Sequence, residues 1–428
     1  MFQTLKNAWK VPELRRKMLF TLLILLLYRI GAVIPVPFVS SDRMHALMSM
    51  GSGSMFQYLN IMSGEAFSRA NLFALAVSPY ITAQIIMQLL TVAIPALEKL
   101  SKLGEEGQKK IQQITRYVTV ALGLITSYGY YMYMRNNNIL TNNGIFEAFV
   151  IIACYTAGAS LIMWLCSKVD EHGIGNGINM VLFSNIVSSG SNIIGTLIGF
   201  VQQYKILGVL LDIVILIAMI AIIVFVVFVT NSERRIPIQY AKRTVGRKMY
   251  GGQSSNLPLK LNMNGVLPII FANSVVAIPS TIAMVFPPKP GGFGEKLVNF
   301  LGYNSWFYIV VFFILIILFS FFYITISFNP VEVSNNLKKN GGSIPGIRPG
   351  KPTSDYIARV LNRVTLIGAL FLDVIAVLPL VVNMVTGSSL GSLAFGGSSL
   401  LIVVGVVLET ARGLEAQMTM RHYKGFLE

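Results

Sequence analysis

Groups that could act on protons, metals or electrons are few in this sequence. Asp373 is the only carboxylate well inside a long apolar segment. A charge at such a depth costs roughly 2.5–3.5 kcal/mol, which makes an ionisable group there a candidate proton or cation site. One carboxylate makes a poor relay, however. The sequence therefore favours a carboxylate that is paired within a helix bundle or lies near an aqueous cavity.

The cysteines and histidines indicate no catalytic or metal site. Cys154 and Cys166 fall in one predicted helix, too far apart along it to bridge, and we expect both to be buried small residues. His45, His172 and His422 lie outside the apolar segments and far apart in sequence. The chain has no HExxH motif and no GxxxxGK[ST] phosphate loop. We therefore expect no catalytic residue, no metal, no cofactor and no nucleotide hydrolysis by this chain.

Transmembrane helices are the elements that must position these residues. The 428 residues are 54% hydrophobic and 12% charged, whereas roughly 25% of a soluble domain is charged. The apolar residues form blocks about as long as the hydrocarbon core of a membrane requires. The sequence predicts an all-α membrane protein with ten transmembrane helices, at 18–36, 72–93, 115–134, 147–167, 177–200, 207–229, 265–286, 305–328, 361–383 and 394–411.

The distribution of Lys and Arg predicts the orientation of these helices. With a cytoplasmic N-terminus, 27 of the 34 basic residues fall in cytoplasmic segments and six in outside segments. Both termini are then cytoplasmic, at 1–17 and 412–428. Ten helices also divide into an N-terminal half, 18–200, and a C-terminal half, 201–411. Such halves fit an inverted-repeat architecture, although they share no convincing sequence repeat.

Four of the predicted helices, 72–93, 177–200, 265–286 and 394–411, are diluted by Ser, Asn, Gln, Gly and Pro. Such residues at membrane depth need protein or water around them. They indicate either helices around an aqueous path or tight packing of small residues between helices, and the residues alone leave both open. The segment 51–71 is similarly ambiguous, because either a short re-entrant, plugging helix or an interfacial helix suits its composition.

Two cytoplasmic loops, 230–264 and 329–363, are long and patterned. The first alternates apolar and basic residues before a run of glycines, which predicts a strand or hairpin that projects from the membrane. In the second, prolines and glycines predict a rigid turn around Arg348. The charge of these loops would be explained if they only fix the membrane topology of the chain or contact anionic lipid. Their length and patterning suit docking of a large acidic partner.

Motifs along essentially the whole chain carry a family resemblance. They are RIG at 29–31, IP at 34–35, FALAVSPY at 73–80, QLLT at 88–91, TRY at 115–117, GIGNGI at 173–178, RR at 234–235, YAKR at 240–243, LPLK at 257–260, FNP at 328–330, NLKK at 336–339 and PGIRPG at 345–350. In this order and at these topological places, the chain resembles the SecY family, the channel subunits of the bacterial protein translocon.

The resemblance implies an hourglass channel that is built from two inverted five-helix halves. Its waist is a pore ring of branched apolar side chains, and the matching positions here are Val77, Ile81, Leu182, Ile270 and Ile402. An apolar ring blocks ions by dewetting, and soft aliphatic side chains can close around a moving polypeptide. All five positions fall in the four diluted helices, which favours the aqueous path. Val and Leu stand where isoleucine is common in the family, which bears on how tightly the ring seals.

The resemblance also implies a plug and a lateral gate. The segment 55–69 matches the plug, for which we select Tyr58, Leu59, Ile61, Met62, Ser63 and Gly64. Helices 72–93 and 265–286 match the gate walls, with Thr82, Gln88, Asn273, Ser274 and Ile278 as gate candidates. Signal peptides and transmembrane segments would leave through that seam into membrane lipid, according to transfer free energies summed over about 20 residues.

The resemblance further implies partners that drive an otherwise passive channel. The docking residues would be Arg348, Arg235, Lys242, Arg243, Arg247 and Lys248. The implied partners are the small subunits SecE and SecG, the motor ATPase SecA, the ribosome and an unfolded preprotein with its signal peptide. The implied place is the bacterial cytoplasmic membrane. The alternative function, from another class, is a secondary transporter of a small solute with Asp373 as its coupling site.

Overall fold

The computed structural model describes residues 2–50, 60, 62–240, 243–245, 248–250, 254–263, 265–286, 292, 300, 302, 305–386 and 396–424. The described chain is helical apart from short strands, and helix is present in each of the ten predicted spans. The all-α prediction is confirmed. The number of helices that cross the membrane stays a prediction.

The helices of the first half run from the N-terminus to residue 204. They are α1 (Phe2–Lys10), α2 (Pro12–Val33), α3 (Ser41–Met50), α5 (Ser78–Ala93), α6 (Pro95–Ser101), α7 (Glu105–Asn136), α8 (Ile145–His172) and α9 (Gly177–Tyr204). Neighbouring pairs in this half pack against one another, namely α2 with α8, α5 with α7, α7 with α8 and α8 with α9.

The second half holds the remaining helices and all five strands. The helices are α10 (Ile206–Asn231), α11 (Leu267–Val276), α12 (Ile278–Val285), α14 (Trp306–Ser327), α15 (Pro330–Lys339), α16 (Lys351–Thr386) and α18 (Gly396–Lys424). The strands are β1 (Glu233–Tyr240), β2 (Arg243–Val245), β3 (Lys248–Tyr250), β4 (Ser254–Lys260) and β5 (Gly342–Ser343).

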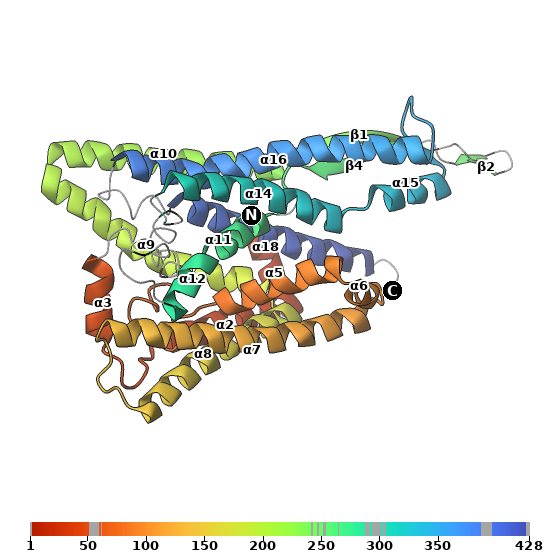
Figure 1. Ribbon diagram of the computed structural model, residues 1–428. Coiled ribbons are helices and arrows are strands. Elements are labelled where there is room, and N and C mark those ends of the chain that lie inside the picture. The colour runs from red at the N-terminus through yellow and green to blue at the C-terminus, as the bar shows by residue number, and fades with distance from the viewer. Residues whose placement is uncertain are drawn as a thin grey trace.

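The two halves form opposite sides of one bundle. In Figure 1, α10, α14 and α16 lie along one side and α2, α7 and α8 along the other. The halves meet where α5 packs on α11 and α7 packs on α12, and again where α9 packs on α10 and α18. One large hydrophobic cluster between them takes buried side chains from α2, α5, α8, α9, α10, α11, α14, α16 and α18. The bundle therefore encloses a shared core at the junction of its halves.

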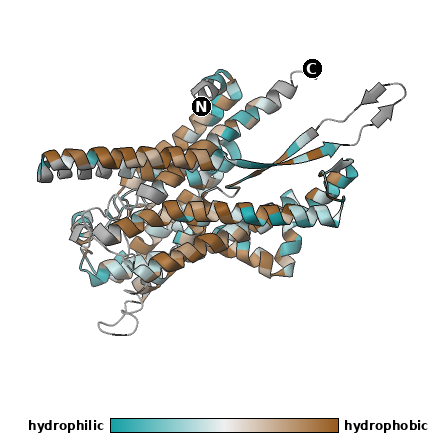
Figure 2. Cartoon of the chain, turned by 90° about the horizontal axis from the view of Figure 1, so that it is seen from above, coloured by the Kyte–Doolittle hydropathy of each residue, from teal (hydrophilic) through white to brown (hydrophobic). Residues whose placement is uncertain are grey.

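Apolar residues dominate the long helices, as a membrane fold requires (Figure 2). By length and composition alone, four described helices are apolar enough to cross a membrane, at Ile145–His172, Gly208–Asn231, Trp306–Lys339 and Lys351–Val382. A fifth candidate is α5 with α6, which are bent by 104° at their junction. Helix α10 exposes many Ile, Leu, Val and Phe side chains, which suits contact with lipid.

Several helix ends differ from the sequence prediction, mostly because of proline. Helix α2 ends at Val33, since the following Pro35 forces an extended backbone at Ile34. Helix α5 begins only at Ser78, and Pro79 occupies its first turn. The predicted helix 265–286 divides into α11 and α12 at Ala277, two residues before Pro279. Helix α7 begins ten residues before the predicted start at 115.

The two patterned loops fold together into one projection. Strand β1 pairs antiparallel with β4 over Glu233–Gln239, and β2 pairs with β3 in a smaller hairpin. The projecting hairpin predicted for 230–264 is confirmed. Strand β5, from the second loop, adds to the other edge of β1. Ile236, Leu259 and Leu337 then share a small core with α15 and α16, so the two loops form one rigid unit.

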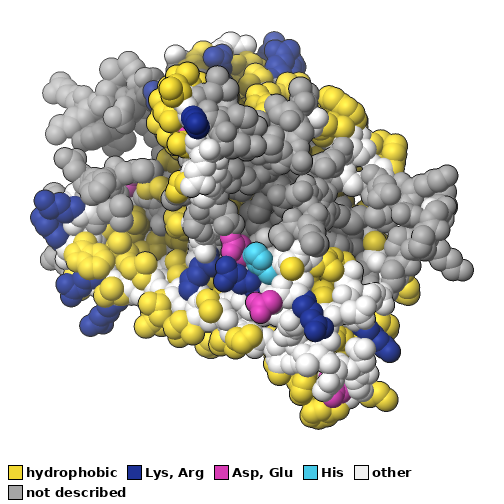
Figure 3. Space-filling view, turned by 90° about the vertical axis from the view of Figure 1, so that its left-hand side faces the viewer, with side chains coloured by type: hydrophobic (Ala, Val, Ile, Leu, Met, Phe, Trp, Pro, Cys, Tyr) yellow, Lys and Arg dark blue, Asp and Glu magenta, His cyan; other side chains and the backbone are white. Residues whose placement is uncertain are grey.

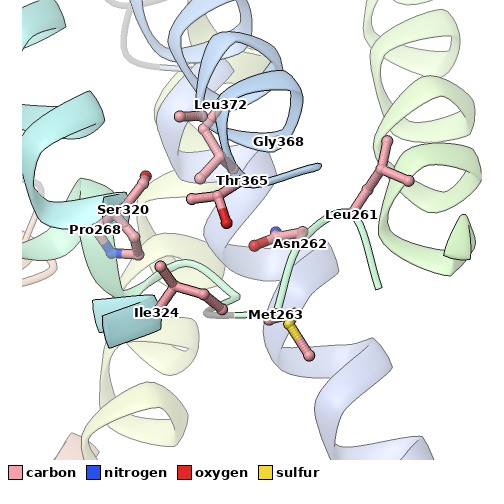
Figure 4. Close-up of a pocket in the computed structure, with 10 residues that line it drawn as sticks. Leu261, Asn262, Met263, Pro268, Ser320, Ile324, Thr365, Gly368 and Leu372 are labelled. Atoms are coloured by element: carbon pink, nitrogen blue, oxygen red, sulfur yellow. The ribbon is translucent and has the colours of Figure 1, made fainter. Parts of the chain in front are cut away.

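The segment after β4 is fixed to α16 by a very close approach. A Cβ added to Gly368 would lie 2.2 Å from the backbone oxygen of Leu261, so only glycine fits. Figure 4 shows Asn262 and Thr365 beside this contact, around a small cavity between the segment and the helices. This packing couples the sheet to the bundle. At the opposite end of the bundle, near α3, the described Lys and Arg side chains are scattered (Figure 3).

Candidate functional site

Residues of the predicted pore ring come from four parts of the chain and are buried together. Val77 precedes α5, Ile81 lies on its first turn, Leu182 on α9, Ile270 on α11 and Ile402 on α18. Each is at most 3% exposed, and all five belong to the same hydrophobic cluster. These side chains therefore face protein rather than lipid. The cluster is larger than the five residues, so their arrangement as a ring stays a prediction.

A cavity with both apolar and polar walls lies beside this buried group. Its volume is about 440 Å³, and α9, α10, α11, α14 and α18 line it. Leu401 and Val266, which line the cavity, lie one residue before Ile402 and about one helical turn before Ile270. Two of the pore-ring candidates, Ile270 and Ile402, thus lie close in sequence to residues of the cavity wall.

The other walls of this cavity carry charge and amide groups. Asn179 donates from Nδ2 to Glu409 Oε2 at 3.1 Å. Arg412 donates to the backbone oxygen of Thr230 at 2.9 Å and to Asn231 Oδ1 at 2.6 Å. Such groups keep water in a cavity, because their desolvation is costly. The cavity therefore combines charged and amide groups with aliphatic side chains in its walls.

A second polar cavity, of about 430 Å³, lies between α5, α7, α8 and α9. Gln84 and Gln88 of α5 face Gln108, Gln112 and other polar residues of α7 and α8 across it. The two cavities adjoin at one hydrogen bond, because Gln88 lines the second cavity and Tyr323 lines the first. The Tyr323 hydroxyl donates to Gln88 Oε1 at 2.5 Å. This bond joins α5 of one half to α14 of the other.

Aromatic rings pack around Tyr323 within the second half. Phe271 of α11 packs on the Tyr323 ring, with centroids 5.1 Å apart, and on Phe319 at 5.9 Å. These pairs hold α11 against α14 beside the seam. Sequence reasoning missed both Tyr323 and Phe271. An aromatic residue in a long apolar run gives no local sign that it faces the other half.

The gate candidates occupy different environments along this seam. Gln88 makes the bond just described, and Thr82 is half-buried on α5. Asn273 and Ser274 are buried on α11, where Ser274 Oγ donates to the oxygen of Ile270 at 2.9 Å. Ile278 begins α12 and is 41% exposed. Because α11 packs on α5 while α12 packs on α7, four helices meet here, whereas the sequence prediction named two spans.

The predicted plug is described only in part. Tyr58, Leu59 and Ile61 lie outside the described residues, whereas Met62, Ser63 and Gly64 lie within them. Residues 63–70 form consecutive turns rather than the expected helix. The reason is local, since Gly64 and Glu65 have φ angles of +61° and +71°, in the left-handed region.

Several hydrogen bonds fix the described plug residues. Ser63 Oγ accepts from the Phe67 N–H at 3.0 Å and donates to Asn60 O at 2.9 Å. Tyr130 donates to the Phe67 oxygen at 2.6 Å, and Tyr155 donates to the Ala70 oxygen at 2.9 Å. These tyrosines belong to α7 and α8. The base of the plug segment, 67–70, is therefore attached to the first half.

The described docking candidates lie in and beside the projecting sheet. Arg348 is exposed, in a turn where Gly346 and Gly350 have φ angles of +80° and +102°. The turn is pinned, because Thr353 Oγ1 donates to the Arg348 oxygen and Ser334 Oγ donates to the Gly350 oxygen, both at 2.8 Å. The rigid turn predicted around Arg348 is thus present.

The other docking candidates are described to different extents. Arg235 is exposed on β1 and donates to Glu233 Oε1 at 2.7 Å. Arg243 begins β2 and Lys248 begins β3. Lys242 and Arg247 lie outside the described residues. The strands place Arg243 and Lys248 on one small hairpin, with Val245 paired to Lys248.

Asp373 is fully buried on α16. Neither of its carboxylate oxygens has a hydrogen-bond partner within the described part of the chain. The paired carboxylate that the sequence favoured is therefore not seen there. One isolated carboxylate also offers no second group for a proton relay.

Comparison with known proteins agrees with this geometry. The SecY family model matches residues 71–411. The protein translocase subunit SecY of Streptomyces galbus is 41% identical over 446 aligned residues, which cover 100% of both chains.

Solved structures share the fold. A SecY protein, described as a translocation channel whose plug domain stabilises the closed state and maintains a membrane seal, aligns with a TM-score of 0.62 at 17% identity. A canine channel from a ribosome–channel complex of the endoplasmic reticulum aligns with a TM-score of 0.60 at 16% identity. Both alignments cover 94% of this chain and 92% of the other. The comparisons support no small-solute transporter.

Proposed function

Because the chain belongs to the SecY family, we propose that it forms the channel that passes unfolded secretory proteins across the bacterial cytoplasmic membrane. We further propose that it releases transmembrane segments sideways into the lipid. One observation carries this proposal: aliphatic residues from four separate elements are buried together beside a large cavity whose walls carry both apolar and polar groups. A hydrated space that ends at a narrow apolar group is the form a polypeptide channel needs.

The pore ring would seal the resting channel. Water leaves a narrow constriction of Val, Ile and Leu side chains, and ions cannot cross it without their hydration. The same side chains have no polar groups that would bind a passing polypeptide. They can also change rotamer to fit different residues. The ring would therefore close around a translocating chain and exclude ions during transport.

Lateral release would occur where α5 meets α11 and α14. A segment of about 20 apolar residues gains free energy by leaving water for lipid, at roughly −0.3 to −0.6 kcal/mol for each Leu, Ile, Phe or Val. To reach lipid it must separate the Tyr323–Gln88 bond, which joins the two halves. The gate therefore opens only for segments whose total gain exceeds the loss of the contacts between the halves, this bond among them.

The projecting sheet would receive the partners that supply energy. An exposed guanidinium pairs bidentately with carboxylates or RNA phosphate, which a lysine cannot copy. Arg348 stands on a turn that is fixed on both sides, so it loses little freedom on binding. The canine relative was solved in a ribosome complex. We propose that the ribosome, the motor SecA and the small subunits SecE and SecG act on this chain as well, with both of its termini in the cytoplasm.

Reconstitution tests the proposed function directly. The chain, with its two small subunits, is placed in lipid vesicles, and the motor ATPase, ATP and a radiolabelled preprotein are added outside. The preprotein should become resistant to external protease, and vesicles without the chain should give no protection. The Asp373→Asn variant should retain protection close to that of the parent chain. Absence of protection with the parent chain, or its complete loss in Asp373→Asn, would contradict the channel assignment.

A further inference from the structure

Arg29 is a charged residue near the outer end of a predicted transmembrane helix, and its guanidinium reaches across to α9. Its Nε donates to Ser184 Oγ at 3.1 Å, and its Nη2 donates to the backbone oxygen of Ser184. An intramembrane charge is expensive unless it is satisfied, and such residues are usually functional. Neither the pore ring, the gate nor the docking loops explains why an arginine stands here.

The tip of the plug rests against the same two helices. Asn185, which follows Ser184, is fully buried and donates from Nδ2 to the Met62 oxygen at 2.6 Å. A Cβ added to Gly64 would lie 3.0 Å from Arg29 Nη1 and 3.0 Å from Asn185 Oδ1. The left-handed backbone and the missing side chain of Gly64 therefore let the tip, residues 62–64, meet both polar groups.

The base of the plug is held by different contacts. Tyr130 and Tyr155 bond the oxygens of Phe67 and Ala70, and Asn71 Nδ2 donates to the Ala32 oxygen at 2.9 Å. Arg29 and Asn185 supply the polar contacts of the tip with α2 and α9 in the described part of the chain, and the Met62 side chain also packs in the large hydrophobic cluster to which both helices contribute. The tip can therefore leave its place while the base stays attached, if these contacts break.

We infer that Arg29 and Asn185 form a clasp, a pair of positioning residues that holds the plug tip closed until a polypeptide enters. This inference rests on the proposed function and adds the residues that regulate its plug. Asn185 supplies the direct bond to the tip. Arg29 supplies a charged surface against Gly64, and its two bonds to Ser184 keep that surface in place. Entry of a chain at the pore ring would separate the tip from α9 and leave the base fixed.

The test measures resting ion conductance of the reconstituted channel, with its small subunits, in planar bilayers without preprotein. Asn185→Leu removes the bond to Met62 and leaves the Arg29–Ser184 bonds. Loss of one hydrogen bond should raise the open fraction, and hence the conductance, roughly fivefold. Ser189→Ala is the matched control, because the Ser189 hydroxyl bonds only to its own helix, at the Asn185 oxygen; it should leave conductance unchanged.

A reversible crosslink distinguishes a clasp from a merely structural role. Gly64→Cys and Asn185→Cys are combined in a chain whose native cysteines, Cys154 and Cys166, are replaced by alanine. Oxidation should pin the tip and give low conductance, and reduction should raise it. If the two cysteines cannot be oxidised to a disulfide, or if reduction leaves the conductance unchanged, the clasp is refuted.

The outcomes also separate the clasp from the proposed function. Parent vesicles that fail to protect a preprotein would count against the channel itself. If the parent chain translocates normally but the conductance of Asn185→Leu equals that of the parent chain, only the clasp is refuted. Arg29→Gln should raise conductance as Asn185→Leu does, and parental conductance in that variant would remove Arg29 from the clasp.

Discussion

The Tyr323→Phe variant tests the proposed gate by removing one hydroxyl group. The change deletes the hydroxyl that donates to Gln88 but keeps the ring, so the contact with Phe271 persists. A net hydrogen bond contributes about 0.5–1.5 kcal/mol. Gln88 also faces a polar cavity, where water can replace the lost donor, so the upper end of this range does not apply. At about 1 kcal/mol, the equilibrium for opening the seam shifts roughly fivefold toward the open form.

The assay compares export of two preproteins that differ in the apolar core of their signal peptide. Removing two leucines lowers the gain on entering lipid by about 1 kcal/mol on the insertion scale. This loss matches the contribution of the Tyr323–Gln88 bond. Tyr323→Phe should therefore restore export of the weakened preprotein to near that of the intact one, while the intact preprotein changes little.

Two further variants make this result specific. Thr325→Val on the same helix removes a hydroxyl that bonds only to the oxygen of Phe321, so export should match the parent chain. Tyr323→Phe combined with Gln88→Ala should improve export no more than either change alone, because both remove the same bond. Equal export of the weakened preprotein by Tyr323→Phe and Thr325→Val would refute the reasoning.

Three other predictions test the ring, the docking turn and the junction of sheet and bundle. Ile81→Ser with Ile402→Ser should wet the constriction and raise the resting conductance severalfold in planar bilayers; an unchanged value would place the ring elsewhere. Arg348→Glu should lower motor-driven export about tenfold or more with little loss of membrane insertion, whereas Arg359→Glu, an exposed control on α16, should stay near the parent level. Gly368→Ala should lower the unfolding temperature in detergent, because relieving its backbone clash costs about 1–3 kcal/mol; an unchanged temperature would mean that the neighbouring segment yields freely.

The helices were predictable because long apolar blocks leave little choice of secondary structure in a membrane. Their ends depended on single prolines, which sequence reasoning weighed too little. Pro279 is one of the residues that dilute the apolar segment 265–286, yet the division of this helix at Ala277 was not predicted. The turns at 63–70 depend on left-handed φ angles, and Glu65, unlike Gly64, gives no sequence sign of such a conformation.

Local sequence patterns do not predict contacts between residues that are far apart in the chain. The Tyr323–Gln88 bond joins residues 235 positions apart, and β5 reaches β1 from another loop. Neither partner alone has a residue type that specifies the other. Arg29 is a different case, since a charge inside a predicted span is a signal by itself. It is the one basic residue that falls in neither the cytoplasmic nor the outside segments, and its place beside the plug tip is evident only from the fold, which sets α9 and the plug next to it.

Photo-crosslinking of a stalled secretory chain tests most directly whether a polypeptide passes the pore ring. A photoreactive residue replaces Ile402 in one channel and Ile217 in another, since Ile217 on α10 is 61% exposed where lipid contact is expected. The stalled chain should crosslink strongly at position 402 and weakly or not at all at 217. Crosslinks of equal yield at both positions, or at 217 alone, would contradict passage through the bundle.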